Sequence, residues 1–157
     1  MKRRFYLHCL VPGLFLLACV VDGTAPGYAQ TVIDGSGRGK AAQAAIQAVA
    51  KHFQAPQDVH FRKIRSVGKN TVCGDVKGDG AAGFSEFGVS ADENPVIFDN
   101  RPIPAALDFK EVNGWLNQSV ALEDLEEMGC VPKGSYARYR DHLNKVMETR
   151  KDTTTTH

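Results

Sequence analysis

The sequence predicts an α+β domain, in which an N-terminal helix packs on a small antiparallel sheet of three or four strands and C-terminal helices follow. Three observations lead to this prediction. An alanine-rich run with helical spacing comes first, short β-rich runs joined by glycine turns come next, and helical spacing returns in the last third. Because the connections between the β-rich runs are short, antiparallel pairing is favoured. We expect a single domain over residues 40–150.

The first 29 residues have the layout of a secretory signal peptide. Three basic residues at positions 2–4 precede an apolar run at 5–21, and small residues precede a predicted cut after Ala29. The alternative is the segment LLAC at 16–19, which resembles a lipoprotein processing box and would leave the mature chain anchored to lipid through Cys19. We therefore expect a secreted or periplasmic protein, or a lipoprotein, without a transmembrane span in the mature chain.

The charge balance excludes some classes of partner. Removal of residues 1–29 leaves 16 basic and 17 acidic residues, a net charge of −1. A chain with this balance has no general attraction for nucleic acid or for an anionic membrane. The remaining partners are a protein or a small ligand in the cell envelope.

The two cysteines of the mature chain, Cys73 and Cys130, predict a disulfide bond. An even number of cysteines in an exported chain is typical of a disulfide framework. A bridge between residues 57 positions apart would stabilise the fold by about 4 kcal/mol. Two free buried thiols are the alternative, whereas structural zinc needs four ligands at close spacing.

The helix and strand signals come in a clear order along the chain. After a flexible leader at 30–39, apolar residues at steps of three and four predict a helix over 40–53, which Pro56 separates from the strands. Alternating or β-branched runs then predict four strands, at 58–67, 71–76, 83–89 and 95–99.

The last third of the chain predicts two or three helices. Asp108 and Glu111 have the spacing of a capping box, and a second helical run extends from Ser119 to a stop at Gly129. Ser135 is the expected N-cap of the last helix. The segment 151–157 is expected to be disordered.

Part of the chain resembles a group of small exported bacterial proteins of unknown function. In residues 58–87, an acidic residue and the pair Phe61-Arg62 lead a strand, the motif VCG with an acidic residue follows, and a glycine-aromatic pair opens the next strand. A tryptophan-bearing helix that ends in a second cysteine comes later, which Trp115 and Cys130 match. The resemblance implies a small exported domain with Cys73 joined to Cys130, and it implies no activity.

The segment DVKGDGAAGFSEF at 75–87 partly matches a calcium loop. Asp75, Asp79 and Glu86 occupy the first, fifth and twelfth positions, and Gly80 occupies the sixth. However, Lys77 brings a positive charge to a ligand position, and the flanking residues have strand composition. We therefore expect a hairpin turn and no metal site, with calcium binding at 75–86 as an alternative.

The candidate binding residues are polar side chains of the predicted strands: His60, Arg62, Arg65 and Glu86. No segment has the spacing of a nucleophile elbow or offers a nucleophile, a base and an orienting group together. The sequence therefore predicts a non-enzymatic interaction or binding module without a cofactor. The alternative is a small hydrolase or an inhibitor-like domain whose site forms from His60, Glu86 and Arg62 on neighbouring strands.

Overall fold

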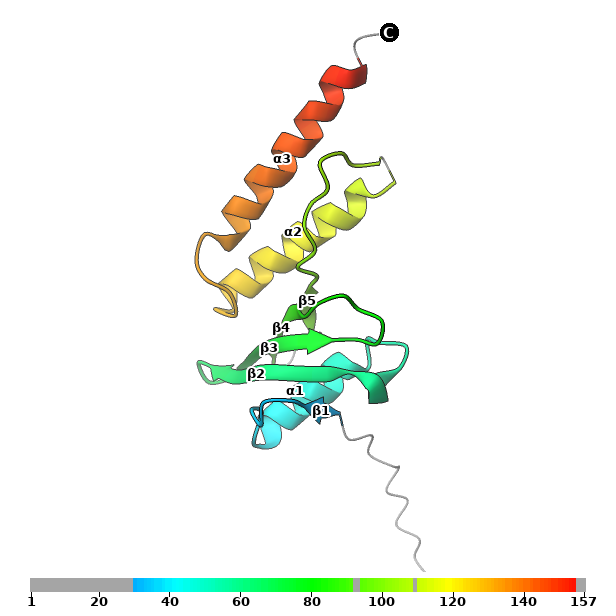
Figure 1. The fold of residues 1–157 in the computed structure, drawn as a ribbon. Helices are drawn as coiled ribbons and strands as arrows, with labels where there is room; N and C mark the ends of the chain where they lie inside the picture. The colour runs from blue at the N-terminus through cyan, green and yellow to red at the C-terminus, as the bar shows by residue number, and fades with distance from the viewer. Residues whose placement is uncertain (1–29, 92–93, 109, 155–157) are drawn as a thin grey trace, which may run out of the picture.

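The computed structural model describes residues 30–91, 94–108 and 110–154, and it confirms the α+β fold class (Figure 1). The predicted signal peptide and Cys19 lie outside the described residues. One sheet of five strands separates helix α1 (Lys40–Ala50) from a hairpin of α2 (Val112–Glu127) and α3 (Ser135–Thr154). The strands are adjacent in chain order: β1 (Thr31–Val32), β2 (His60–Val67), β3 (Thr71–Lys77), β4 (Ser85–Ser90) and β5 (Val96–Phe98).

The sheet is mixed, which corrects the prediction of a purely antiparallel sheet of three or four strands. Strands β2 to β5 are antiparallel neighbours as predicted, but β1 adds a fifth strand parallel to β2. This strand lies in the segment 30–39, for which the sequence predicts a flexible leader. Two paired residues are too short a run to produce a strand pattern, so β1 could not be recognised.

The first face of the sheet packs against α1 and forms the main core. Alanines at positions 42, 45 and 50 give α1 a narrow apolar face, from which Ile46 and Val49 also point inward. Phe61 and Phe87 are fully buried below it, with their rings edge to face at 5.8 Å between centroids. Burial of an apolar side chain of this size stabilises the fold by about 1.5–3 kcal/mol.

The second face carries the disulfide and one end of the helical hairpin. Cys73 of β3 is bonded to Cys130, which follows α2, across 57 positions of the chain. Leu122 and Leu125 of α2 pack beside the bridge. A Cβ atom at Gly88 would lie 2.9 Å from the Cys130 Sγ, so the absence of a side chain on β4 allows the bridge to approach the sheet. The predicted disulfide is present in the structure.

Helices α2 and α3 begin differently from the sequence expectation. The two runs predicted before Gly129 form one helix, and Glu111 precedes it without a side-chain cap, so the Asp108–Glu111 capping box does not form. The Glu126 carboxylate of α2 accepts hydrogen bonds from the backbone N–H groups of Gly134 (2.7 Å) and Tyr136 (2.9 Å). These bonds lower the pKa of Glu126. Glu126 therefore caps α3 in place of Ser135.

Helix α3 ends at Thr154, so it extends into the segment 151–157, for which the sequence predicts disorder. It runs away from the sheet, as Figure 1 shows. A small separate core, formed by Leu107, Trp115, Leu143 and Val146, joins the hairpin to the loop before α2. Of the helices in the described ranges, none combines the length and the apolar character that crossing a bilayer requires.

Candidate functional site

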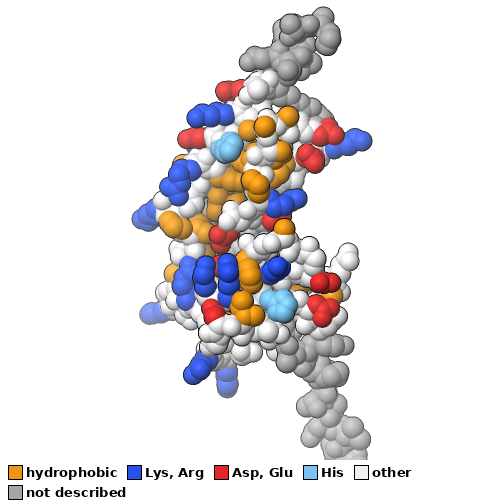
Figure 2. Space-filling model, in the orientation of Figure 1, with side chains coloured by type: hydrophobic (Ala, Val, Ile, Leu, Met, Phe, Trp, Pro, Cys, Tyr) orange, Lys and Arg blue, Asp and Glu red, His pale blue; other side chains and the backbone are white. Residues whose placement is uncertain are grey.

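The second face of the sheet is divided into an apolar half under the hairpin and a polar half beside it. Strand pairing brings Arg62, Asp75 and Glu86 into one row across β2, β3 and β4, and His60 and Lys77 into the next. Figure 2 shows Lys and Arg side chains gathered over the strand layer below the hairpin. We use the name polar half-face for the following residues of this surface: His60, Arg62, Lys63, Arg65, Asp75, Lys77, Phe84 and Glu86.

A β-bulge in β2 shapes the polar half-face. Arg62 is opposite Asp75, but Arg65 is opposite Cys73, so β2 has one more residue in this interval than β3. Lys63 has a φ of 53°, and it is the one residue other than glycine with a positive φ in the described part of the chain. This backbone conformation costs a lysine about 1–2 kcal/mol. Bulges are often found where a strand must redirect a side chain next to a functional site.

The segment after β1 holds the bulge in place. The Asp34 carboxylate accepts a hydrogen bond from the Lys63 backbone N–H at 2.6 Å, and the Ser36 hydroxyl accepts one from Ile64 N–H at 2.9 Å. Hydrogen bonds from the Ser36 side chain and from the Lys63 backbone lower the pKa of Asp34 to about 2. The strained residue Lys63 and its neighbour Ile64 are therefore each held by one side chain from the segment after β1.

Because of the bulge, two cationic side chains contact one carboxylate. The Asp75 Oδ2 atom lies 2.9 Å from the Arg62 Nε and 3.1 Å from the Lys63 Nζ. Strict alternation would point Arg62 and Lys63 to opposite faces of the sheet. The Arg62 guanidinium also stacks on the Phe84 ring, at 3.9 Å from its centroid. Two contacts thus fix the orientation of this guanidinium, whose side chain is still 36% exposed.

Glu86 is a carboxylate without a partner for one of its oxygens. Its Oε2 atom is buried, and no hydrogen-bond partner for it lies among the described residues. Burial raises the pKa of Glu86, the charge of Asp75 raises it further, and Lys63 and Arg62 act in the opposite direction. A buried polar group without a partner is costly, typically about 1–3 kcal/mol. The polar half-face thus contains a second feature that does not serve stability.

The other predicted site residues are less closely associated. His60 is exposed on the same face, and in the described part of the chain it makes no hydrogen bond to Arg62 or Glu86. Arg65 donates a hydrogen bond from Nη2 to the Cys130 carbonyl oxygen at 2.5 Å, so it braces the disulfide region. The hydrolase alternative required His60, Glu86 and Arg62 together, whereas Asp75 lies between Arg62 and Glu86.

Sequence reasoning missed Lys63 and Phe84. Lys63 stands next to Arg62, so an alternating strand would have placed it on the α1 face, and no residue pattern reveals the bulge that moves it. Phe84 precedes β4 in a glycine-rich segment, where its ring becomes the platform for Arg62. The glycine-aromatic pair at 83–84 was the available signal for Phe84, and no signal was available for Lys63.

The structure around residues 75–86 differs from that of an EF-hand calcium loop. Asp75 is in β3 and Glu86 is in β4, opposite each other, while Asp79 is exposed in the turn between these strands. An EF-hand loop lies between helices. Asp75 is already paired with Arg62 and Lys63, and no group of three or more potential metal ligands occurs in the residues that the structure describes.

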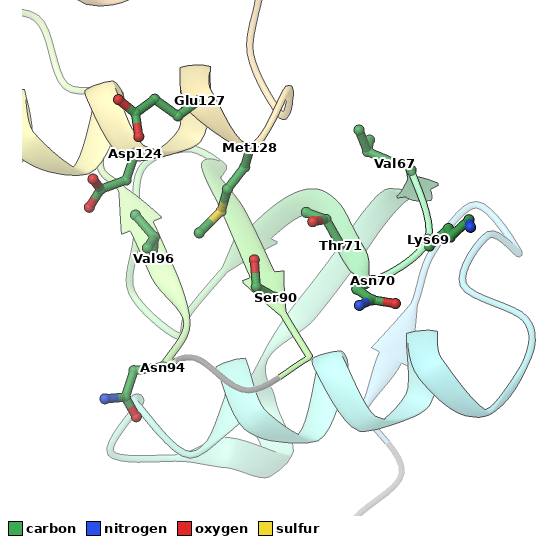
Figure 3. Close-up of a pocket in the computed structure, with 11 residues that line it drawn as sticks. Val67, Lys69, Asn70, Thr71, Ser90, Asn94, Val96, Asp124, Glu127 and Met128 are labelled. Atoms are coloured by element: carbon green, nitrogen blue, oxygen red, sulfur yellow. The ribbon is translucent and has the colours of Figure 1, made fainter.

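A polar cleft of about 790 Å³ lies at the other end of the strands, between the β2–β3 turn, the β4–β5 connection and the end of α2. In Figure 3, Met128 points from α2 toward the sheet between Val96 and Ser90, and Asp124 and Glu127 lie on the helical side. The cleft is open, and its lining shows neither backbone strain nor a buried carboxylate without a partner. The polar half-face is therefore the better candidate site.

Comparison with known proteins finds no family model, no curated protein and no solved structure that matches this chain.

Proposed function

We propose that this protein is a small, exported, non-enzymatic binding module that contacts a partner in the cell envelope through the polar half-face. Export is supported by the basic and then apolar start of the sequence. It is also supported by the Cys73–Cys130 bridge, because disulfides persist in oxidising compartments.

The observation that carries the binding role is the bulge at Lys63. A positive φ at a lysine persists only where surrounding contacts enforce it, and such strain is concentrated at functional sites. Here Asp34 and Ser36 enforce it, and the result is a cationic pair that shares Asp75 on an open surface. Folding alone does not require this arrangement, since Lys63 is 64% exposed and its ion pair contributes little to stability.

A non-enzymatic role is supported by the shape of the site. Catalytic groups usually converge in an enclosed pocket, whereas these side chains are spread across strands β2 to β4. Arg62 and Lys63 pair with Asp75, and Asp75 lies between Arg62 and Glu86. Such a surface suits recognition of a partner.

Site-specific photo-crosslinking tests this proposal. Benzoylphenylalanine placed at His60, which is exposed on the polar half-face, should give a discrete adduct when the full chain is produced in cells and irradiated. The same group at Arg138, exposed on α3, is the matched control and should give none. Fractionation of the same cells should place the protein in the envelope with both thiols protected from alkylation.

The adduct should also disappear when Arg62→Gln is combined with the crosslinker at His60. Equal labelling from both positions, or no adduct from His60, would reject the polar half-face as a binding surface. Free thiols in protein recovered from the envelope would reject the oxidised, exported state.

A further inference from the structure

We propose that the polar half-face docks an acidic peptide segment of the partner, with a carboxylate of the peptide bound by Arg62 and Lys63 and a neighbouring apolar side chain in the adjacent hollow. This inference rests on the proposed binding function, and it adds the chemistry of the partner.

An anion can bind where two cations of the surface meet. Across the polar half-face and the adjacent hollow the charges balance, with Arg62, Lys63, Arg65 and Lys77 against Asp58, Asp75, Asp79 and Glu86, but Arg62 and Lys63 lie together at one point. Asp75 is shared by Arg62 and Lys63, so two cations meet one carboxylate at their junction. Because Glu86 lies in the same row and adds negative charge, a singly charged carboxylate suits this junction better than a phosphate group, which carries about two negative charges.

Arg62 has the geometry of a prepared carboxylate receptor. A guanidinium has five N–H donors in a fixed plane, and in Arg62 only the Nε donor is used by Asp75. The Phe84 ring supports the plane from one side and limits its rotation. The terminal donors can therefore form a bidentate pair with an incoming carboxylate without much loss of side-chain freedom.

The hollow beside this receptor can take an apolar side chain. It has a volume of about 570 Å³, and it extends from Phe84 past His60 and Lys77 to Ile33, which is 55% exposed. Asp58 and Asp79 also line it, so they disfavour a carboxylate inside the hollow itself. An extended peptide with an apolar residue next to an acidic residue satisfies both parts of the surface.

Fluorescence anisotropy with labelled peptides and the disulfide-bonded protein tests the inference. The probe is Gly-Phe-Glu-Gly-Phe-Glu, and the comparison peptides replace both glutamates by lysine or both phenylalanines by serine. We expect the probe to bind at least about tenfold more tightly than either comparison peptide, because charge-assisted hydrogen bonds and apolar contact both contribute. Added salt should weaken the binding.

Substitutions test whether binding of the probe depends on Arg62 and Lys63 or on positive charge in general. Arg62→Gln and Lys63→Gln should each weaken binding of the probe about tenfold, while Lys133→Gln, which removes an exposed cation after α2, should leave it unchanged. Thermal melts of each variant establish that it is folded. Equal loss in all three variants, or equal binding of the lysine peptide, would overturn the inference.

Two further outcomes are decisive. Displacement of the probe by an equimolar amount of inorganic phosphate would overturn the inference, because the site would then be a general oxyanion site. If the His60 crosslink forms but the probe does not bind, the acidic peptide is wrong and the binding function stands. If neither is observed, both proposals fail.

Discussion

The two halves of the second sheet face use the same strands for opposite purposes. In the apolar half, Cys73 and Gly88 lie under Leu125 and Cys130, and a Cβ atom at Gly88 would come within 2.8 Å of Leu125 and 2.9 Å of Cys130. In the polar half, two residues away from this pair on each of β3 and β4, Asp75 and Glu86 are surrounded by charge and lie next to open surface. The change from apolar to charged surroundings thus occurs within β3 and again within β4.

The apolar half of this sheet face therefore serves stability, and the polar half has the proposed binding role. The disulfide half resists unfolding, so the polar half can retain a strained lysine and a carboxylate without a partner. A surface with these costs is expected where a protein meets another molecule. Mutations in the apolar half should therefore change stability, and mutations in the polar half should change binding at little cost in stability.

The largest expected effect comes from removal of the disulfide. The paired substitution Cys73→Ala with Cys130→Ala releases a constraint across 57 positions, so the free energy of unfolding should fall by about 4 kcal/mol. Chemical denaturation measures the change, and reduction of the parent protein should reproduce it. If the midpoint is the same with and without the bridge, the apolar half does not have the stabilising role described here.

A smaller loss in the free energy of unfolding is expected from Gly88→Ala. The new Cβ would lie 2.8 Å from both Leu125 Cδ2 and Met128 Sδ, so overpacking should cost about 1–3 kcal/mol in denaturation experiments. Gly114→Ala on α2 is the control, because its Cβ meets nothing within 4 Å and alanine favours a helix by about 1 kcal/mol. Unchanged stability of the Gly88 variant would mean that the bridge does not rest on β4.

In the polar half, Glu86→Gln should increase stability near neutral pH. The pKa of Glu86 is raised in the folded state, so its contribution is most favourable below the unfolded value of 4.5 and is lost as the pH rises through the folded pKa. Glutamine does not titrate, so thermal melts should show a gain at pH 7 that vanishes near pH 4. Glu148→Gln, on the exposed side of α3, is the matched control. A gain that is independent of pH would contradict this assignment.

The sequence predicted those parts of the fold that have a strong local pattern. The apolar spacing predicted α1, the β-rich runs predicted β2 to β5, and the two cysteines outside the predicted signal peptide predicted the bridge. The helix and the strands depend on residues close in the chain, and the disulfide follows from the presence of two cysteines. The shared face of His60 and Arg62 was also predictable, because they alternate with the apolar residues Val59 and Phe61, which the structure buries.

The remaining features depend on contacts between distant residues. Strand β1 and the Asp34 contact exist because β2 lies beside them, with 29 positions between Asp34 and Lys63. The cap of α3 comes from Glu126 of another helix, so the local Ser135 signal was misleading. Lys63 reaches Asp75 only through a bulge, which reverses the alternation on which strand prediction relies.

The stability of Lys63→Gly tests most directly the claim that a lysine at the bulge is not needed for folding. Glycine adopts a positive φ without strain, and the exposed ion pair that is lost contributes little. We therefore predict a free energy of unfolding equal to that of the parent or up to about 1 kcal/mol higher, with Lys63→Ala below Lys63→Gly because alanine retains the strain. A loss of more than about 1 kcal/mol in Lys63→Gly would show that the lysine serves the fold, and it would contradict the account.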